Sequence, residues 1–289
     1  MTYEKFKNFY RIIFLSAIIF LPILVQAASF SLRPAKQEIA LEPGTSIHKS
    51  ITITNNLGYN SYFKIKVKNI ESSHSSPYLL TDFVNLETAE IFVATDQTKT
   101  VYFDIDIPIQ TKPGGAYGYF QVIARPISGK DIGASVSAAL GSSIFVRIKG
   151  PIKEAGRLVS FGIIGGRQVK IRTPLWWHFS FKNSGDIYLN PYGKILLTNK
   201  IIGTKQLVDV PPSSVLPGQT RLFEIKLNDL SFPGLYSAVL LLNRGYNNEI
   251  DILEIDFWFF PWSMLAIFLV AGLFFIFVFV LRLIRKKNV

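Results

Sequence analysis

Residues 62–68, Tyr-Phe-Lys-Ile-Lys-Val-Lys, decide the fold class of this chain. Apolar and basic residues alternate in this stretch with a period of two, which is typical of a strand that has one face on a core and the other in water. Residues 51–54 and 101–107 repeat the alternation, the latter with carboxylates on its polar face. The sequence therefore predicts antiparallel sheets that each cover a hydrophobic core.

Turn residues separate such runs through most of residues 29–256. The clusters include Pro43-Gly44, Asn55-Asn56-Leu57-Gly58, Pro113-Gly114-Gly115 and Pro217-Gly218. Short strands with regular turn signals are typical of β-sandwiches. Residues 150–157 interrupt the pattern near the midpoint, so we place a domain boundary between residues 152 and 153. Each half then has about the length of one immunoglobulin-like domain.

The two halves share a loose internal echo. A Pro-Gly turn precedes an alternating strand in both, at Pro43-Gly44 before residues 51–54 and at Pro217-Gly218 before residues 222–227. This echo favours two domains of like architecture.

The beginning of the chain has the pattern of a secretory signal peptide. Lys5, Lys7 and Arg11 precede an uncharged run over residues 12–25, and Ala27-Ala28 follow. A basic segment, a short apolar segment and small residues at the cleavage site are the parts of such a peptide. We predict a signal peptide over residues 1–28, with an uncleaved anchor as the alternative.

The other end of the chain predicts a membrane span. Residues 257–281 contain no charged side chain, and a run of 25 residues is long enough to cross a bilayer. Trp258 and Trp262 lie at its start, where indole rings favour the lipid headgroups. A basic cluster follows at once, formed by Arg282, Arg285, Lys286 and Lys287. Basic flanks stay on the cytoplasmic side, so the sequence predicts a single-pass protein of the cell membrane with its body outside and its C-terminus inside.

The predicted organisation is all-β apart from that span. It comprises a signal peptide (1–28), two tandem immunoglobulin-like β-sandwiches (29–152 and 153–256), one C-terminal transmembrane helix (257–281) and a basic cytoplasmic tail (282–289).

Composition excludes several classes of protein. The 289 residues include no cysteine, which rules out disulfides and cysteine-ligated metals, and 49% of them are hydrophobic, which rules out disorder as the main state. Of the net charge of +11, residues 1–28 carry +2 and the tail carries +4, which leaves +5 for the part between them. A net charge of only +5 on this part of the chain does not indicate nucleic-acid binding.

The first half resembles a family of bacterial surface proteins, the WxL-interacting proteins. The resemblance lies in Phe-Ser-Leu-Arg-Pro-Ala at 30–35, Leu-Glu-Pro-Gly-Thr at 41–45, Ile-Thr-Ile-Thr-Asn-Asn at 51–56, and Gly-Gly-Ala-Tyr-Gly-Tyr-Phe-Gln-Val at 114–122. That resemblance implies a peptidoglycan-binding first domain, a protein-binding second domain and attachment to the lipid bilayer.

No local pattern indicates an active site or a metal site. His48, His74 and His178 lie in different predicted elements, without the spacing of metal ligands, and no Gly-x-Ser-x-Gly motif is present. The paired acids Asp104 with Asp106 and Glu254 with Asp256 are placed by strand alternation on the solvent face. We therefore expect no enzyme, no cofactor and no metal, with a cell-wall hydrolase as the least favoured reading.

Aromatic residues are the candidates for ligand contact. Tyr117 and Tyr119 share one strand face by their spacing, and the adjacent Trp176 and Trp177 point to opposite faces, one toward the core and one outward. The small-residue stretch 134–148 is either a strand that closes its own sandwich or an edge that pairs with a partner strand.

Together these features predict a non-enzymatic, membrane-anchored surface protein. Its first domain would contact peptidoglycan and its second a surface protein. The alternative is an adhesin or a chaperone-like envelope assembly module that uses an exposed sheet edge.

Overall fold

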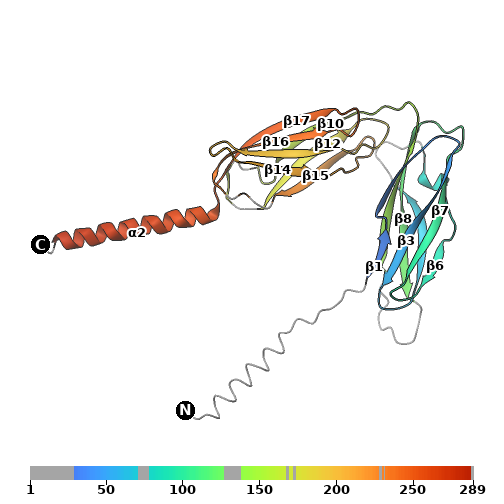
Figure 1. Cartoon of the computed structure of the whole chain (residues 1–289), viewed down its shortest axis with the longest axis horizontal. Coiled ribbons are helices and arrows are strands. Elements are labelled where there is room, and N and C mark those ends of the chain that lie inside the picture. The colour runs from blue at the N-terminus through green and yellow to red at the C-terminus, as the bar shows by residue number, and fades with distance from the viewer. Residues whose placement is uncertain are drawn as a thin grey trace, which may run out of the picture.

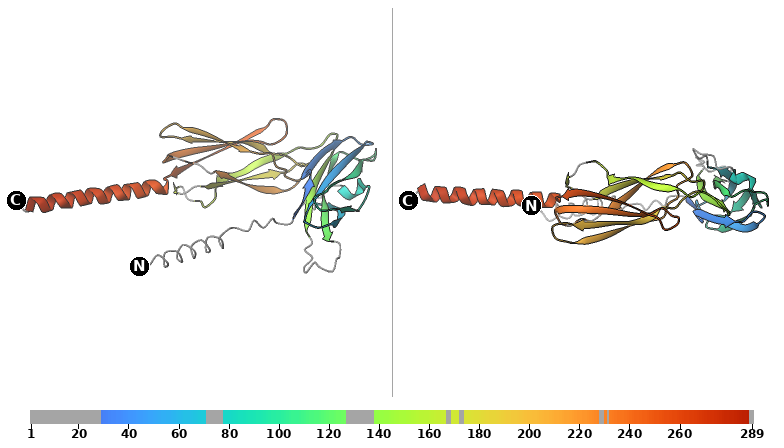
Figure 2. Two further views of the ribbon diagram at one scale, coloured as in Figure 1. Left: turned by 60° about the horizontal axis from the view of Figure 1, so that its bottom comes forward. Right: turned by 90° about the horizontal axis from the view of Figure 1, so that it is seen from above.

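The structure is a computed structural model that describes residues 29–70, 78–126, 138–166, 169–171, 174–227, 230 and 232–287. Two β-sandwiches follow each other along the chain, and a helix leaves the far end of the second (Figures 1 and 2). The long axes of the two sandwiches meet at an angle, so that the molecule is bent at their junction (Figure 1). The predicted signal peptide, residues 1–28, lies outside the described residues.

The N-terminal sandwich consists of two facing sheets. The four-stranded sheet has the order β1-β3-β7-β5 and the five-stranded sheet the order β2-β9-β8-β4-β6. Their strands are β1 (Ser29–Arg33), β3 (Ser46–Asn56), β7 (Thr98–Asp106) and β5 (Val84–Leu86), then β2 (Lys36–Leu41), β9 (Ala139–Ile148), β8 (Gly114–Pro126), β4 (Ser61–Asn69) and β6 (Glu90–Val93). A single 3-10 turn, η1 (Leu80–Asp82), packs beside β4 and β8.

The C-terminal sandwich repeats this plan. One sheet has the order β10-β12-β15 and the other the order β11-β17-β16-β13-β14. The strands are β10 (Gly156–Ile163), β12 (Leu175–Asn183) and β15 (Thr220–Leu227), then β11 (Val169–Lys170), β17 (Ile250–Phe259), β16 (Gly234–Asn243), β13 (Tyr192–Asn199) and β14 (Lys205–Val210). In both sandwiches the first strand is split between the sheets, and its second part pairs in parallel with the last strand. This is the immunoglobulin-type arrangement that the sequence predicts.

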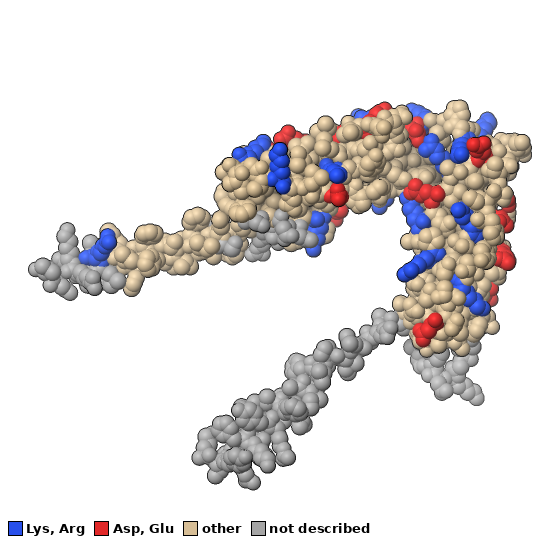
Figure 3. All heavy atoms as spheres, in the orientation of Figure 1, with Lys and Arg blue, Asp and Glu red and all other residues tan. Residues whose placement is uncertain are grey.

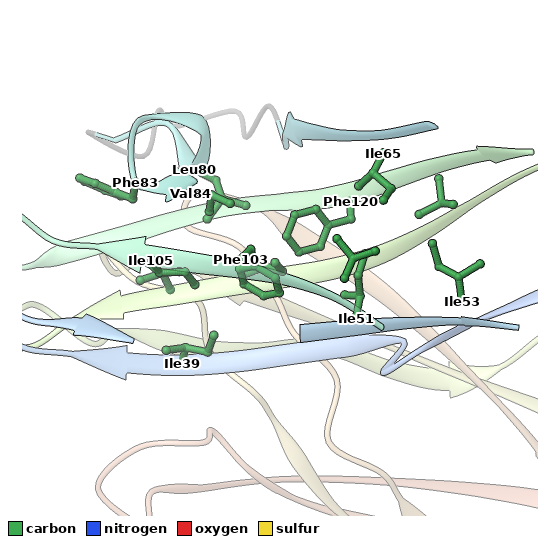
Figure 4. Packing of buried hydrophobic residues seen from close by; sticks show 14 of the residues in the cluster. Ile39, Ile51, Ile53, Ile65, Leu80, Phe83, Val84, Phe103, Ile105 and Phe120 are labelled. Carbon is green, nitrogen blue, oxygen red and sulfur yellow. The ribbon is translucent and has the colours of Figure 1, made fainter. Parts of the chain in front are cut away.

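Strand alternation builds each core. In β4, Phe63 and Ile65 are buried, whereas Lys64 and Lys66 point outward. Figure 4 shows how buried side chains from both sheets of the N-terminal sandwich meet, with the Phe103 and Phe120 rings 4.6 Å apart in an edge-to-face contact. Rings of that size supply much of the apolar area that stabilises a sandwich.

A buried asparagine marks the equivalent position in the two sandwiches. Asn55, at the end of β3, donates to the carbonyls of Tyr59 and Val93 and accepts from the Leu57 N–H. Asn183, at the end of β12, donates to the carbonyls of Ile187 and Val215 and accepts from the Gly185 N–H. Each fixes the turn that follows by satisfying backbone groups that would otherwise be buried without partners.

The strand that follows each network is also equivalent. The main-chain N–H of Asn55 donates to Gln97 and that of Asn183 donates to Gln219, and a Gln-Thr pair leads into β7 and into β15. The Pro-Gly echo is therefore a false repeat, because Pro43-Gly44 precedes β3 whereas Pro217-Gly218 precedes β15, the counterpart of β7.

The predicted membrane span over residues 257–281 is wrong. Phe257 and Phe259 belong to β17 and are buried in the core of the C-terminal sandwich, so the apolar run begins inside a sheet. The helix α2 (Trp262–Lys287) begins only after it and includes the basic residues assigned to a tail. In the described part of the chain, no helix is long and apolar enough to cross a membrane. This overturns the predicted single-pass localisation in the cell membrane.

We predict that Asn55→Ala and Asn183→Ala each destabilise their own sandwich by about 3 kcal/mol, because each removes three hydrogen bonds between a buried amide and the main chain. All four tryptophans lie at residues 176–262, so tryptophan fluorescence during urea unfolding reports on the C-terminal half alone. Asn183→Ala should shift that transition, whereas Asn55→Ala should shift only the transition seen by circular dichroism.

The exposed neighbours provide matched controls, since Asn56→Ala and Ser184→Ala remove polar groups in the same turns without opening the networks. Equal effects of Asn55→Ala and Asn56→Ala would contradict the assigned role.

Candidate binding surface at the junction of the two sandwiches

A small aromatic cluster joins the two sandwiches. Tyr117 of β8 and Phe145 of β9 lie on the outer face of the five-stranded sheet, opposite each other in register. They pack with Tyr188 and Leu216 of the C-terminal sandwich, and Tyr117 is only 2% exposed. The Tyr117 ring centroid lies 5.5 Å from that of Phe145 and 5.8 Å from that of Tyr188, both edge-to-face. The Tyr188 N–H donates to the Tyr117 hydroxyl over 3.0 Å. This hydrogen bond fixes the orientation of the two sandwiches at the cluster, in addition to the apolar packing.

Polar residues surround this cluster and connect the same two bodies. Glu38 of β2 accepts hydrogen bonds from Asn190 Nδ2, at 2.9 and 3.2 Å, and from the Tyr188 hydroxyl at 3.3 Å. Lys36 donates to Glu38 and to Ser214, and its ammonium lies 4.7 Å from the centroid of the Phe145 ring. A network that satisfies every member fixes orientation more firmly than apolar packing alone.

The environment of the junction shifts three pKa values. Burial raises the pKa of Tyr117 to about 12 and also raises that of Tyr188, where the nearby Glu38 carboxylate adds to the effect. Burial alone would raise the pKa of Glu38, but hydrogen bonds from Lys36, Asn190 and Tyr188 together with the Lys36 charge outweigh it and leave the pKa below its ordinary 4.5. At neutral pH both phenols are therefore hydrogen-bonding neutral groups and Glu38 is ionised.

Gly115 gives the Tyr117 side chain its position. A Cβ atom added at Gly115 would lie 1.9 Å from the Tyr117 hydroxyl oxygen, because the phenol folds back over the residue two positions earlier. The Gly114-Gly115 pair therefore serves close packing at the start of a strand.

The four aromatic residues predicted to contact a ligand occupy three different settings. Tyr117 lies inside the junction, and Tyr119 lies beside it on the same face, half-buried opposite Ser143 and Lys68. Trp177 is buried in the core of the C-terminal sandwich, while Trp176 is 43% exposed near Lys226, so the adjacent indoles do point to opposite faces as alternation predicts. Trp176 and Trp177 follow Leu175, the first residue of β12, whereas the other end of that strand reaches the junction, so the structure does not bring the two pairs together. A role of these residues in ligand contact stays a prediction.

The residues predicted to lie at a membrane surface are found around the start and end of α2. Trp258 lies on β17 and stacks on Phe260 with centroids 5.6 Å apart, and Trp262 is the exposed first residue of the helix. The cations Arg282, Arg285, Lys286 and Lys287 lie within its last turns.

Sequence reasoning missed Phe145, Tyr188 and Glu38 at the junction. One signal was present, because Ile144-Phe145-Val146 places an apolar residue on the face that alternation assigns to water. Such a residue indicates a second contact surface.

Among the described residues, no group of three or more His, Asp or Glu side chains lies close enough together to hold a metal ion. His48 and Asp104 form an exposed pair with a 2.7 Å contact on the opposite sheet of the N-terminal sandwich.

Charge is distributed unevenly around the N-terminal sandwich. In Figure 3, lysine and arginine gather on the side that faces the hollow of the bend, and acidic residues gather on the far side. The outer face of the five-stranded sheet carries Lys64, Lys66, Lys68 and Arg125. The opposite sheet carries Asp104 and Asp106.

No protein-family model and no curated protein matches the sequence, so the resemblance to WxL-interacting proteins is not confirmed. Solved structures that are similar to this chain include three with low sequence identity. They are the Salmonella enterica SafA pilin in complex with the SafB chaperone (12% identity, 80% of this chain and 98% of that chain, TM-score 0.41), the E. coli chaperone DraB (13%, 79% and 99%, 0.38) and a chaperone–tip adhesin complex of CFA/I fimbriae (11%, 79% and 98%, 0.39). At such identities and TM-scores, function has to be argued from the residues of this chain.

We predict that Tyr117→Ala loosens the junction, because it removes the ring that all the other aromatic side chains of the cluster contact. The chain has no cysteine, so spin labels can be placed on Thr100→Cys and Lys205→Cys, one exposed site on each sandwich. The distribution of distances between the labels should broaden in Tyr117→Ala and stay narrow in the control Tyr119→Ala. Equal distributions in the two variants would show that the junction does not depend on Tyr117.

The same labels test the role of Glu38. A carboxylate whose pKa is lowered on folding stabilises the folded arrangement above its ordinary pKa, and that contribution is lost as the pH falls through the lowered value. The distance distribution should therefore broaden as the pH falls below 4.5, the ordinary pKa of a glutamate. In Glu38→Gln it should be broad already at neutral pH and change little on acidification; a distribution in Glu38→Gln that matches the unsubstituted chain would refute this.

Proposed function

We propose that this chain is a non-enzymatic, chaperone-like binding protein that holds an extended segment of a protein partner along the open edge of β9. The observation that carries the proposal is the incomplete pairing of this strand. Strand β2 pairs with β9 only from Ser143 to Ile148, so among the described strands residues 139–142 pair with β8 alone. Of the stretch 134–148, residues 134–137 lie outside the described residues, residues 143–148 close the sandwich against β2, and residues 139–142 are paired on one side only.

Hydrogen-bond directions along β9 show which groups are free. The Ala124 N–H donates to the Ala138 carbonyl, which fixes the even-numbered residues of β9 as those that bond to β8. The Ser143 N–H donates to the Ala35 carbonyl on the other side, in agreement with that assignment. The main-chain N–H and C=O groups of Ala139 and Gly141 therefore point away from β8, where a partner strand would meet them.

The open edge lacks two of the features by which proteins block edge-to-edge pairing. Exposed edges are often protected by charged side chains or by proline. Elsewhere in this molecule, the edge strand β14 carries Lys205 and Asp209. By contrast, residues 139–142 read Ala-Leu-Gly-Ser, with no charge and no proline. An unprotected edge of this kind favours β-augmentation by a polypeptide.

The junction supports this function by fixing where the edge lies. Strand β9 supplies Phe145 to the junction, and its open stretch ends at Ser142, three residues before Phe145. A fixed presentation lowers the conformational cost of binding an extended segment.

Gly141→Pro tests the proposal, because it removes one outward N–H from the edge. A Cβ atom at this position would meet Tyr119 Cδ2 at 3.5 Å, an ordinary contact, so Gly141→Ala is a control that adds a side-chain atom and keeps the N–H. A photo-crosslinking amino acid at Ala139 would report binding in the cells that make the protein, and the same amino acid at Thr100, on the opposite sheet, would report background.

We expect a partner cross-linked from Ala139 but not from Thr100. The yield should fall about tenfold in Gly141→Pro and persist in Gly141→Ala, since one main-chain hydrogen bond contributes about 0.5–1.5 kcal/mol. A yield unchanged by Gly141→Pro would refute binding along this edge.

A further inference from the structure

Three lysines form a row on the face of the sheet that borders the open edge. Lys64, Lys66 and Lys68 alternate along β4 with buried or inward residues, so all three side chains lie on the outer face. In register with them across β8 are Ile123, Gln121 and Tyr119. This is the face that carries Tyr117 into the junction, and Figure 3 shows Lys and Arg gathered on the side of the N-terminal sandwich that faces the hollow of the bend.

Among the described residues, Lys64, Lys66 and Lys68 form no ion pair. One acid, Glu90, stands opposite Lys64 on β6, and Arg125 adds a fourth cation further along the face. Uncompensated charge of one sign on a concave side raises the local concentration of the opposite charge.

The spacing of the row indicates the chemistry of its occupant. Alternate residues of a strand lie about 6.7 Å apart, so the lysines present positive charge at that interval along a line. A second polypeptide in extended conformation has the same interval between its own alternate side chains. Carboxylates at alternate positions of such a segment would therefore meet the lysines one to one.

The residues around the row favour a polypeptide over a uniformly charged polymer. The exposed side chains of Tyr62 and Phe92, whose ring centroids lie 5.6 Å apart, border the cations at the Lys64 end, and Tyr119 borders them at the Lys68 end. An occupant thus needs apolar groups beside its anionic ones, which a peptide supplies and a polyphosphate chain does not.

We infer that this lysine row is a docking surface for an extended acidic segment of the protein partner, with Asp or Glu at alternate positions. The inference rests on the proposed function, since it assigns a chemical character to the partner held in the bend. It concerns the face of the sheet rather than its edge, so the two can fail independently.

The test uses the full chain and synthetic peptides with blocked ends. One peptide has glutamates at alternate positions between valine and threonine, and its isomer has the same residues with the glutamates contiguous. We expect the alternating peptide to bind more tightly than the isomer, with an affinity that falls as salt is raised. The triple variant Lys64→Gln, Lys66→Gln, Lys68→Gln should lose about tenfold in affinity for the alternating peptide.

A charge-matched variant provides the control. Lys194→Gln, Lys205→Gln, Lys226→Gln removes the same charge from exposed strand positions of the C-terminal sandwich and should bind like the unsubstituted chain. The reversed variant Lys64→Glu, Lys66→Glu, Lys68→Glu should instead bind a peptide with alternating lysines, which a loss of folding could not produce.

Three outcomes would overturn the inference. Equal affinity for the two isomers would show attraction to charge without register, and tighter binding of inorganic polyphosphate would assign the row to a polyanion of another class. Absence of binding to every probe would remove the site. If the partner cross-linked from Ala139 is captured equally well by the triple Gln variant, the lysine row fails while the proposed function stands.

Discussion

The bend of this molecule depends on one phenol ring. Tyr117 leaves the outer face of a sheet in the N-terminal sandwich and packs under Tyr188 and Leu216 of the C-terminal one, and its hydroxyl accepts a main-chain hydrogen bond from the second body. Because the Tyr117 ring is both buried and hydrogen-bonded, it opposes separation of the two sandwiches and also their sliding past each other. Glu38 and Lys36 then hold the rim through hydrogen bonds to residues 188, 190 and 214. The hollow of the bend, with its basic wall and open edge, keeps its shape only while these contacts persist.

The open edge and the junction belong to the same sheet, and this has a structural cause. The first strand of the sandwich changes sheets at residues 34–35, so β2 can cover only the later part of β9. The part left uncovered, residues 139–142, carries no charged side chain. In the covered part, Phe145 turns outward to the neighbouring sandwich and Ile144, Val146 and Ile148 turn inward to the core. One strand thus serves the core, the junction and the edge with different residues.

Much of the fold could be predicted because strand alternation is a local signal. The run at residues 62–68 defines a strand, its buried side and its basic side with no knowledge of the neighbours, and Trp176 and Trp177 divide between solvent and core for the same reason. The junction could not be predicted, because Tyr117 looks like any outward aromatic residue until Tyr188 is placed against it. The predicted membrane span failed at its start, since an uncharged run does not show where a buried strand ends and a helix begins: Phe259 closes a core and Trp262 begins α2. The Pro-Gly echo misled because turn residues recur at unlike positions, whereas the true repeat rests on a buried asparagine and a distant Gln-Thr pair.

That asparagine network also shows how the two sandwiches differ at their ends. Counting from the equivalent residues Asn55 and Asn183, the fifth residue onward is Asn60 in one and Tyr188 in the other. Tyr188 inserts into the junction, while the Asn60 side chain accepts the Thr95 N–H and closes its own turn. The same turn therefore contacts a neighbouring sandwich through Tyr188 in one case and is closed by its own Asn60 side chain in the other. In tandem architectures each unit contacts only its neighbours, and here the equivalent position of the turn distinguishes a unit end that makes such a contact from one that bonds within itself.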